Sequence, residues 1–245
     1  MGLFDKKYCD VCGEKIGLLG NRKLEDGNLC KDCARKLSPW FSERRNSSVN
    51  EIKRQLEYRE ENRGRVEAFH ITRTLGSGTK LLLDEDAGLF MVTSAKNIAE
   101  ANPDVLALSD VTGCTLDVEE SSKELLHEDK DGNEVRYNPP RYEYSYDFYI
   151  IVNVNNPYFN EMRFRINPNS VEISPPPSIR PGVTLRFNPE TNAEYKKYKQ
   201  LGEEIRQILV KVRDDAREKI EQAAAPKTAV SCPYCGATTT PDASG

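Results

Sequence analysis

The sequence predicts an α+β fold in which a small four-cysteine module precedes a connector helix, an antiparallel β domain and a long C-terminal helix. Two Cys-x-x-Cys pairs, separated by 17 residues, lie near the N-terminus. Near residue 69 the apolar residues change from helical spacing to a period of two, and helical spacing returns after Pro189. These three observations fix the fold class and the order of its parts.

The length and composition limit the number of units. With 245 residues, 38% of them apolar, the chain can form one domain of ordinary size plus small modules. The net charge of −4 supplies no global field that would attract nucleic acid. We expect five segments: a zinc-binding module (1–46), a connector helix (47–68), an antiparallel β domain (69–188), a long helix (189–225) and a partial zinc-ribbon tail (226–245).

The sequence also carries signals of location. No run approaches the roughly 20 apolar residues that span a bilayer, and the first residues lack a secretory apolar core. Six of the seven cysteines form three Cys-x-x-Cys pairs, which is typical of metal sites in a reducing compartment. We therefore expect no transmembrane segment and a cytoplasmic location.

The first module is predicted from four cysteines: Cys9, Cys12, Cys30 and Cys33. Gly13 follows the first pair as in a zinc knuckle, residues 18–29 form a short hairpin with a turn at Asp26-Gly27, and the second pair opens a helical turn. Knuckle, hairpin and ligands at a helix start are the layout of a treble clef. Four thiolates satisfy tetrahedral Zn²⁺ without an open position, so we expect a structural metal, with a redox dithiol as the alternative.

Few apolar residues are available to this module. The set that we expect it to bury is Leu18, Leu19, Leu24, Leu29, Leu37, Trp40 and Phe41. So small a core does not support folding alone, which predicts that the metal is required.

The connector helix is predicted from a capping box, Ser48 with Glu51, followed by Val49, Ile52 and Leu56 at helical spacing. Beyond Leu56 the stretch is charged on every side, which predicts a solvated helix. A nucleic-acid contact through its arginines is the alternative, and the interleaved glutamates weaken it. Those arginines are Arg59, Arg63 and Arg65.

The β domain begins with short strands predicted at residues 70–74, 80–83, 89–93 and 111–118, with a loop or helical turn over 94–104. In the last strand Cys114, Leu116 and Val118 share one face, which predicts a core position for Cys114 rather than a reactive thiol. His70 and His127 have no ligand-type neighbours in sequence, so a metal-ligand role is not expected for His127, and His70 is interpreted as structural.

The clearest strand spans residues 141–154, where aromatic and branched side chains alternate with polar ones, and residues 162–166 form its antiparallel partner. Residues 119–138 are rich in charge, with Asp131-Gly132-Asn133 at their centre, and predict an exposed, mobile hairpin loop.

The last helix is predicted to begin at Asn188, the cap, with Pro189 at its first position after a stiff proline-rich crossing over 175–182. Its first half should pack on the β domain, and its second half should project into solvent or meet a partner helix. The apolar stripe consists of Tyr195, Tyr198, Leu201, Ile205, Ile208, Leu209 and Val212.

The tail contains a third cysteine pair, Cys232 and Cys235, in a knuckle pattern. Two thiolates do not complete a zinc site. The chain stopping before a second pair is the favoured interpretation. The alternatives are that two chains each donate a pair, or that the tail is free of metal.

These motifs carry a resemblance to known proteins. Cys9-x-x-Cys12-Gly13, Asp26-Gly27-x-x-Cys30-x-x-Cys33-x-x-Lys36, Tyr58-Arg-Glu-Glu-Asn62 and Phe69-x-x-Thr72-Arg-x-x-Gly76 resemble a family of bacterial zinc-binding proteins known as a domain of unknown function. The body, with Asn156-Pro-Tyr158 and a C-terminal helix, is similar in element order to pleckstrin-homology (PH)-like domains of the GRAM kind, and the tail resembles half of a zinc ribbon. The resemblance implies metal binding, a PH-like barrel or sandwich, and a lipid or protein contact.

The function predicted from these features is a non-enzymatic zinc-binding adaptor that contacts a protein partner or a second copy of itself. The sequence shows no Ser-His-Asp grouping and no phosphate-binding Gly loop of the G-x-x-x-x-G-K type. One alternative is recognition of anionic lipid by the β body through Lys80, Arg163, Arg165, Arg180 or Arg186. The other is nucleic-acid binding through the zinc module, by Arg22, Lys23, Arg35, Lys36, Arg44 and Arg45 with Trp40 and Phe41.

Overall fold

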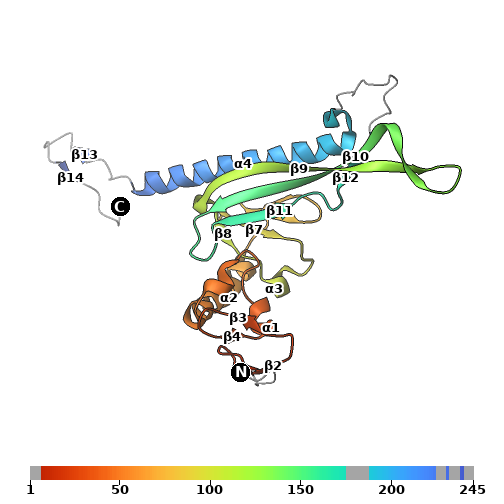
Figure 1. The fold of residues 1–245 in the computed structure, drawn as a ribbon. Helices are drawn as coiled ribbons and strands as arrows, with labels where there is room; N and C mark the ends of the chain where they lie inside the picture. Colours follow the sequence, from red (N-terminus) through yellow and green to blue (C-terminus); the bar gives the residue numbers. More distant parts are fainter. Residues whose placement is uncertain (1–6, 175–187, 225–229, 232–237, 240–245) are drawn as a thin grey trace.

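The chain is arranged as a small four-cysteine module at one end, a β body in the middle and a long helix, α4, across the far side (Figure 1). The computed structural model describes residues 7–174, 188–224, 230–231 and 238–239. Helices and antiparallel strands are mixed along the chain, which confirms the α+β class.

The module is built from very short elements. They are β1 (Lys7–Tyr8), β2 (Lys15–Ile16), β3 (Arg22–Lys23), β4 (Asn28–Leu29), α1 (Lys31–Arg35) and η1 (Glu43–Asn46). The ladder of β3 with β4 confirms the hairpin that turns at Asp26-Gly27. Leu18 and Leu19 are exposed, so the prediction that they are buried is wrong. They lie in the loop between β2 and β3, while Ile52 from the next helix fills the core in their place.

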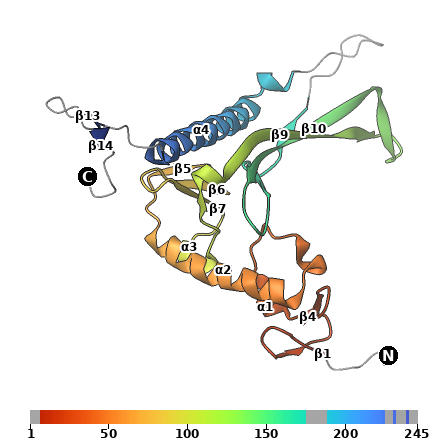
Figure 2. The same cartoon turned by 90° about the vertical axis from the view of Figure 1, so that its left-hand side faces the viewer.

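Helix α2 (Val49–Ala68) runs from the module to the β body (Figure 2). Its capping box is present, since the Ser48 hydroxyl accepts from the Glu51 N–H and the Glu51 carboxylate accepts from the Ser48 N–H. The prediction that the helix is solvated on every side beyond Leu56 is wrong, because Arg59 and Asn62 are buried.

Partners for these two polar side chains come from residues 36–38 and 102–105. Arg59 donates to the Asp104 carboxylate at 2.7 Å, to the Lys36 carbonyl at 3.2 Å and to the carbonyl of Asn102. Ser38 donates to the other Asp104 oxygen at 2.8 Å. This polar junction joins the end of the module, α2 and the β body, and it excludes Arg59 from any nucleic-acid contact.

The first sheet of the body has the order β5-β6-β7-β8. Its elements are β5 (Arg73–Leu75), β6 (Lys80–Asp84), β7 (Leu89–Thr93) and β8 (Leu106–Ala107), with α3 (Ile98–Ala101) before β8 and η2 (Leu108–Asp110) after it. The three strands predicted before residue 94 and the helical turn within 94–104 are thereby confirmed.

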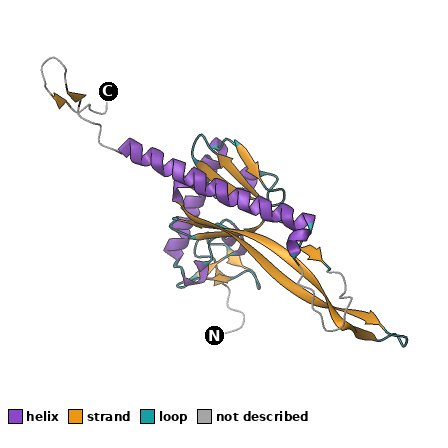
Figure 3. Ribbon diagram, turned by 90° about the horizontal axis from the view of Figure 1, so that it is seen from above, coloured by secondary structure: helices purple, strands orange, loops and turns teal. Residues whose placement is uncertain are grey.

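The second sheet is organised around β10 (Glu134–Val154). Strand β9 (Val111–Glu128) pairs along one edge, and β11 (Glu161–Arg165) and β12 (Val171–Ile173) follow one another along the other edge. The loop predicted over 119–138 is wrong, because β9 and β10 continue as a ladder to the Glu128–Glu134 pair (Figure 3). The charged side chains predicted a loop. They are also compatible with a strand pair that is solvent-exposed on both faces.

Helix α4 (Ala193–Ala224) covers the second sheet, and Asn192 caps it by accepting from the backbone of Glu194 and Tyr195. The predicted start is therefore wrong, since Asn188 caps only the short turn η3 (Pro189–Thr191). The stripe from Tyr195 to Val212 faces the core, as predicted, and Cys114 packs there half-buried. The end of α4 extends beyond the sheet (Figures 1 and 3).

The two sheets are separate. Among the described residues no strand of one sheet pairs with a strand of the other, so the closed barrel that the PH-like resemblance implies is not formed. Two short strands, β13 (Val230–Ser231) and β14 (Thr238–Thr239), pair near the C-terminus. Cys232, Cys235, Arg180, Arg186 and the proline-rich crossing lie outside the described residues. Within the described part of the chain, no helix has the length and apolarity needed to cross a bilayer.

Candidate metal centre

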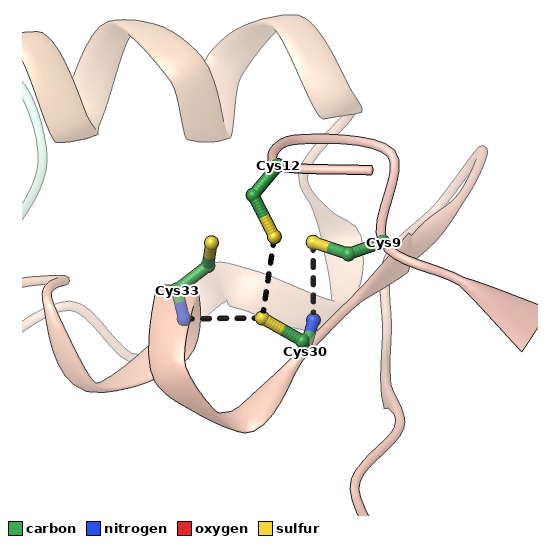
Figure 4. Close-up of side chains that lie close together, drawn as sticks. All are labelled: Cys9, Cys12, Cys30 and Cys33. Atoms are coloured by element: carbon green, nitrogen blue, oxygen red, sulfur yellow. Dashed lines mark hydrogen bonds between the residues drawn. The ribbon is translucent and has the colours of Figure 1, made fainter. Parts of the chain in front are cut away.

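The first two cysteines lie on a tight knuckle between β1 and β2. The Gly13 N–H donates to the Cys9 carbonyl at 2.8 Å, and the Cys9 N–H donates to the Glu14 carbonyl at 2.9 Å. Gly13 has a φ of +76°, a left-handed conformation that glycine adopts without steric cost. This turn directs the Cys9 and Cys12 side chains toward the same centre (Figure 4).

The second pair lies at the start of α1. Cys30 is the N-cap, and its sulfur accepts from the Cys33 N–H at 3.3 Å. The Cys30 N–H in turn donates to the Cys9 sulfur at 3.3 Å, which connects the two halves of the site. The backbone therefore positions two of the thiols, those of Cys9 and Cys30, through N–H donors from the second pair.

The four sulfurs lie within 4.8 Å of one another (Figure 4). The Cys12 and Cys30 sulfurs are 3.7 Å apart, and all four thiols are free rather than joined as disulfides. Four thiolates bound tetrahedrally at about 2.3 Å from a metal would be about 3.8 Å apart. The donor set and its spacing therefore fit a metal ion with four sulfur ligands.

The thiols differ in how readily they ionise. Burial opposes the charged form of Cys9, but backbone N–H groups of Cys12, Cys30 and Val11 outweigh it and lower the pKa of this thiol to about 7. Burial raises the pKa of Cys33, and its hydrogen bonds with Cys12 and Cys30 raise it further. Four negative sulfurs at this spacing repel one another, so a cation is needed to hold them as thiolates.

The site is also the centre of the module's core. Cys9, Cys30 and Cys33 are buried together with Leu24, Leu29, Leu37 and Ile52. Two carboxylates whose contacts the sequence did not predict hold this arrangement. Asp10 accepts from the Asn28 N–H at 2.6 Å, and Asp26 accepts from the Val49 N–H at 2.7 Å at the start of α2. A negative charge is favourable at the N-terminus of α2, but Asp26 lies 23 residues before Val49, so no local sequence signal pointed to this contact.

The other titratable candidates lie away from this centre. His70 and His127 are both exposed, and the His127 ring stacks on Tyr137 with centroids 4.5 Å apart. Burial raises the pKa of Cys114 to about 12, which disfavours a reactive thiolate. No described cysteine other than the four of the module belongs to the metal-type cluster.

Two of the cations predicted for lipid recognition by the body, Arg163 and Arg165, are engaged within the fold. Arg163 bonds the carboxylates of Asp117 and Glu119 and stacks on the Tyr149 ring at 3.5 Å. Arg165 bonds the Asp147 carboxylate at 3.0 Å and the Pro168 carbonyl at 2.6 Å. These contacts oppose a lipid role for these two arginines.

The cations of the module are arranged differently. Arg22, Lys23, Arg44 and Arg45 line one groove. Arg35, which the sequence analysis placed with them, pairs instead with Asp32 on α1 at 3.4 Å.

Comparison with known families extends over the module alone. Residues 7–55 match a family model described as a domain of unknown function, DUF4428. The match confirms the resemblance for the four-cysteine module and the start of α2, and it does not reach the predicted PH-like body or the tail. Neither curated proteins nor solved structures gave a match to the chain.

Proposed function

We propose that the protein is a non-enzymatic adaptor whose four-thiolate module holds one structural Zn²⁺. The observation that carries the metal assignment is the set of four sulfurs within 4.8 Å, three of them on buried cysteines. Zinc prefers tetrahedral thiolate sites, and four protein ligands leave no coordination position for a reacting water. Such a site stabilises a fold rather than a transition state.

The adaptor role is supported by how the parts are connected. The buried Arg59–Asp104 pair of α2 and the body also bonds the Lys36 carbonyl and the Ser38 hydroxyl, and so attaches the end of the module to the body. Helix α4 lies on the opposite side and extends past the sheet that it covers (Figure 1). A protein built in this way presents two separated surfaces, to a protein partner or to a second copy of itself.

The metal assignment is tested by the metal content of the full chain. Cys30→Ser should lose one zinc equivalent, because it removes a thiolate ligand while serine can still cap α1, whereas Cys114→Ser should keep the same content as the wild type. Visible absorbance from bound iron, or equal zinc in Cys30→Ser and the wild type, would contradict the assignment.

The adaptor role is tested by cross-linking and native mass. A defined protein partner or a dimer should be recovered with the wild type and with Cys114→Ser, and should be lost with Cys30→Ser. If the wild type binds zinc but is monomeric, and its cross-linked species are the same as those of Cys30→Ser, the adaptor role is contradicted. The metal assignment is then unaffected.

A further inference from the structure

The most exposed large apolar side chains of the described residues are adjacent to each other. Leu18 is 92% exposed and Leu19 is 89% exposed, in the loop between β2 and β3. A hydrogen bond of 3.0 Å from the Gly20 N–H to the Gly17 carbonyl closes this loop into a tight turn. Single exposed leucines are common, but two adjacent ones at the end of one turn form a small exposed apolar patch that has no role in the core. We call Leu18 and Leu19 the leucine tip.

A cationic groove lies beside this leucine tip. The groove has a volume of about 750 Å³ and is lined by Asn21, Arg22, Lys23, Leu24, Glu25, Arg44, Arg45 and Asn46. Glu25 is its one carboxylate, and none of its four cations forms an ion pair with a described residue. The arginines of the polar junction and of the second sheet are, by contrast, matched with carboxylates.

The groove and the tip are continuous. Arg22 donates from Nη1 to the Leu19 carbonyl at 3.3 Å, and Arg44 donates from Nη1 to the Lys23 carbonyl at 2.6 Å. Partial burial and the nearby charges of Arg45 and Arg22 lower the pKa of Arg44, so like charges are held together here without an acidic partner. An external anion would relieve that repulsion.

We propose that this end of the module docks on an anionic phospholipid surface. Leu18 and Leu19 enter the boundary between headgroups and acyl chains, and the four cations of the groove contact headgroup phosphates. Binding of this kind combines buried apolar area with attraction to anionic lipid, and each of the two parts alone gives weak attachment.

The leucines favour a membrane over nucleic acid as the occupant. A nucleic-acid surface on the module would combine the cations with aromatic stacking. Trp40 packs instead against the core of the body, and Phe41 lies edge-on to Tyr158 with ring centroids 6.5 Å apart. A phosphate-rich partner without an apolar phase would leave Leu18 and Leu19 without a role.

The position of the module is compatible with this docking. It lies at the end of the molecule opposite α4, with the β body between them (Figures 1 and 2). Contact with a membrane at this end leaves α4 and the long β9–β10 hairpin free, and does not depend on the adaptor role.

Co-sedimentation of the zinc-loaded full chain with vesicles tests the proposal. The vesicles are phosphatidylcholine with or without phosphatidylglycerol. Binding should require phosphatidylglycerol and weaken with salt. Leu18→Ser/Leu19→Ser should reduce the affinity about tenfold or more, since the leucines leave the lipid phase. Lys23→Gln/Arg45→Gln, which changes only exposed cations, should reduce the affinity by about 30-fold, since each cation near an anionic surface contributes a factor of about five to six.

The matched control is Leu126→Ser/Lys130→Gln, which removes one exposed leucine and one exposed cation from the β9–β10 hairpin. It should bind like the wild type, and all variants should keep the same zinc content. The proposal is overturned if the wild type binds neither kind of vesicle. It is also overturned if the wild type binds but neither Leu18→Ser/Leu19→Ser nor Lys23→Gln/Arg45→Gln weakens the binding. If the chain instead binds a DNA duplex or inorganic phosphate, and this binding is weakened by Lys23→Gln/Arg45→Gln but not by Leu18→Ser/Leu19→Ser, that anion and not a lipid is the ligand of the groove.

Discussion

The module and the β body bury their interiors with different chemistry. In the second sheet, Phe148, Ile150 and Val152 alternate into a core that α4 covers with its own apolar stripe. In the module, three cysteines take the places that leucines would fill, beside Leu24 and Leu29. The body can therefore be stabilised by apolar burial alone, whereas the module depends on what its thiolates bind.

This difference teaches that one chain can combine a self-sufficient core with a conditional one. The two are connected by α2, which contributes Ile52 to the core of the module and Val66 to a cluster with Leu82 and Met91 of the first sheet. Perturbing each core separately therefore measures how independent the two are.

Metal removal is expected to have the largest effect. Structural zinc in small modules has an apparent binding free energy of about 10 kcal/mol or more, which is comparable to the whole stability of a small domain. A chelator should abolish hydrogen-exchange protection in peptides containing Leu24 and Leu29 while peptides containing Phe148 and Ile150 keep theirs. Simultaneous loss of protection in both regions would show that the body also depends on the metal.

The connection between the two cores is tested by Asp104→Ala. Asp104 is fully buried and Arg59 is 6% exposed, so this change leaves a buried guanidinium without its carboxylate. We expect the free energy of unfolding to fall by about 3–5 kcal/mol in chemical denaturation.

The control for that change is Glu60→Ala, which breaks the exposed pair with Arg63 and should cost less than about 0.5 kcal/mol. The double variant Arg59→Met/Asp104→Leu should recover much of the loss, because it removes both charges. Equal stability of Asp104→Ala and Glu60→Ala would show that the junction does not bind the two parts together.

The same junction shows where sequence reasoning stops. Cysteine spacing predicted the four-thiol cluster because ligand geometry is local, and the period of two predicted β10 because one face of that strand is buried. Arg59 and Asn62 were predicted to be solvated, since their partners lie some forty residues away in sequence. No local pattern encodes that contact.

Composition misled the prediction in two other places. Charged residues from 119 to 138 predicted a loop. In the structure β9 and β10 pair there, so their backbone groups are hydrogen-bonded while their charged side chains reach water. Leu18 and Leu19 were counted as core because apolar residues usually are, although the glycines on either side place them in a turn that projects from the module. In both cases tertiary context, rather than residue type, decided burial.

Loss of a helix cap should have a moderate effect that differs between the two parts. Ser48→Ala removes the acceptor for the Glu51 N–H at the start of α2, and Asn192→Ala removes the acceptor at the start of α4. Each should cost about 1 kcal/mol of stability. By hydrogen exchange, Ser48→Ala should loosen the module, while Asn192→Ala should leave it unchanged. Identical exchange patterns in the two variants would mean that the cores unfold as one.

The smallest effect on stability is expected for Leu18 and Leu19 at the tip of the module. Comparing them with a buried leucine distinguishes surface from core positions within the module. Leu18→Ser/Leu19→Ser should change the free energy of unfolding of the zinc-loaded protein by less than about 0.5 kcal/mol, because these side chains contact water in the folded and unfolded states alike. Leu29→Ala, at a fully buried leucine of the same module, should cost about 2–5 kcal/mol. Denaturation at fixed zinc concentration measures both. A large loss at the tip would mean that Leu18 and Leu19 pack in the core after all, which would also remove the exposed apolar patch on which membrane docking relies.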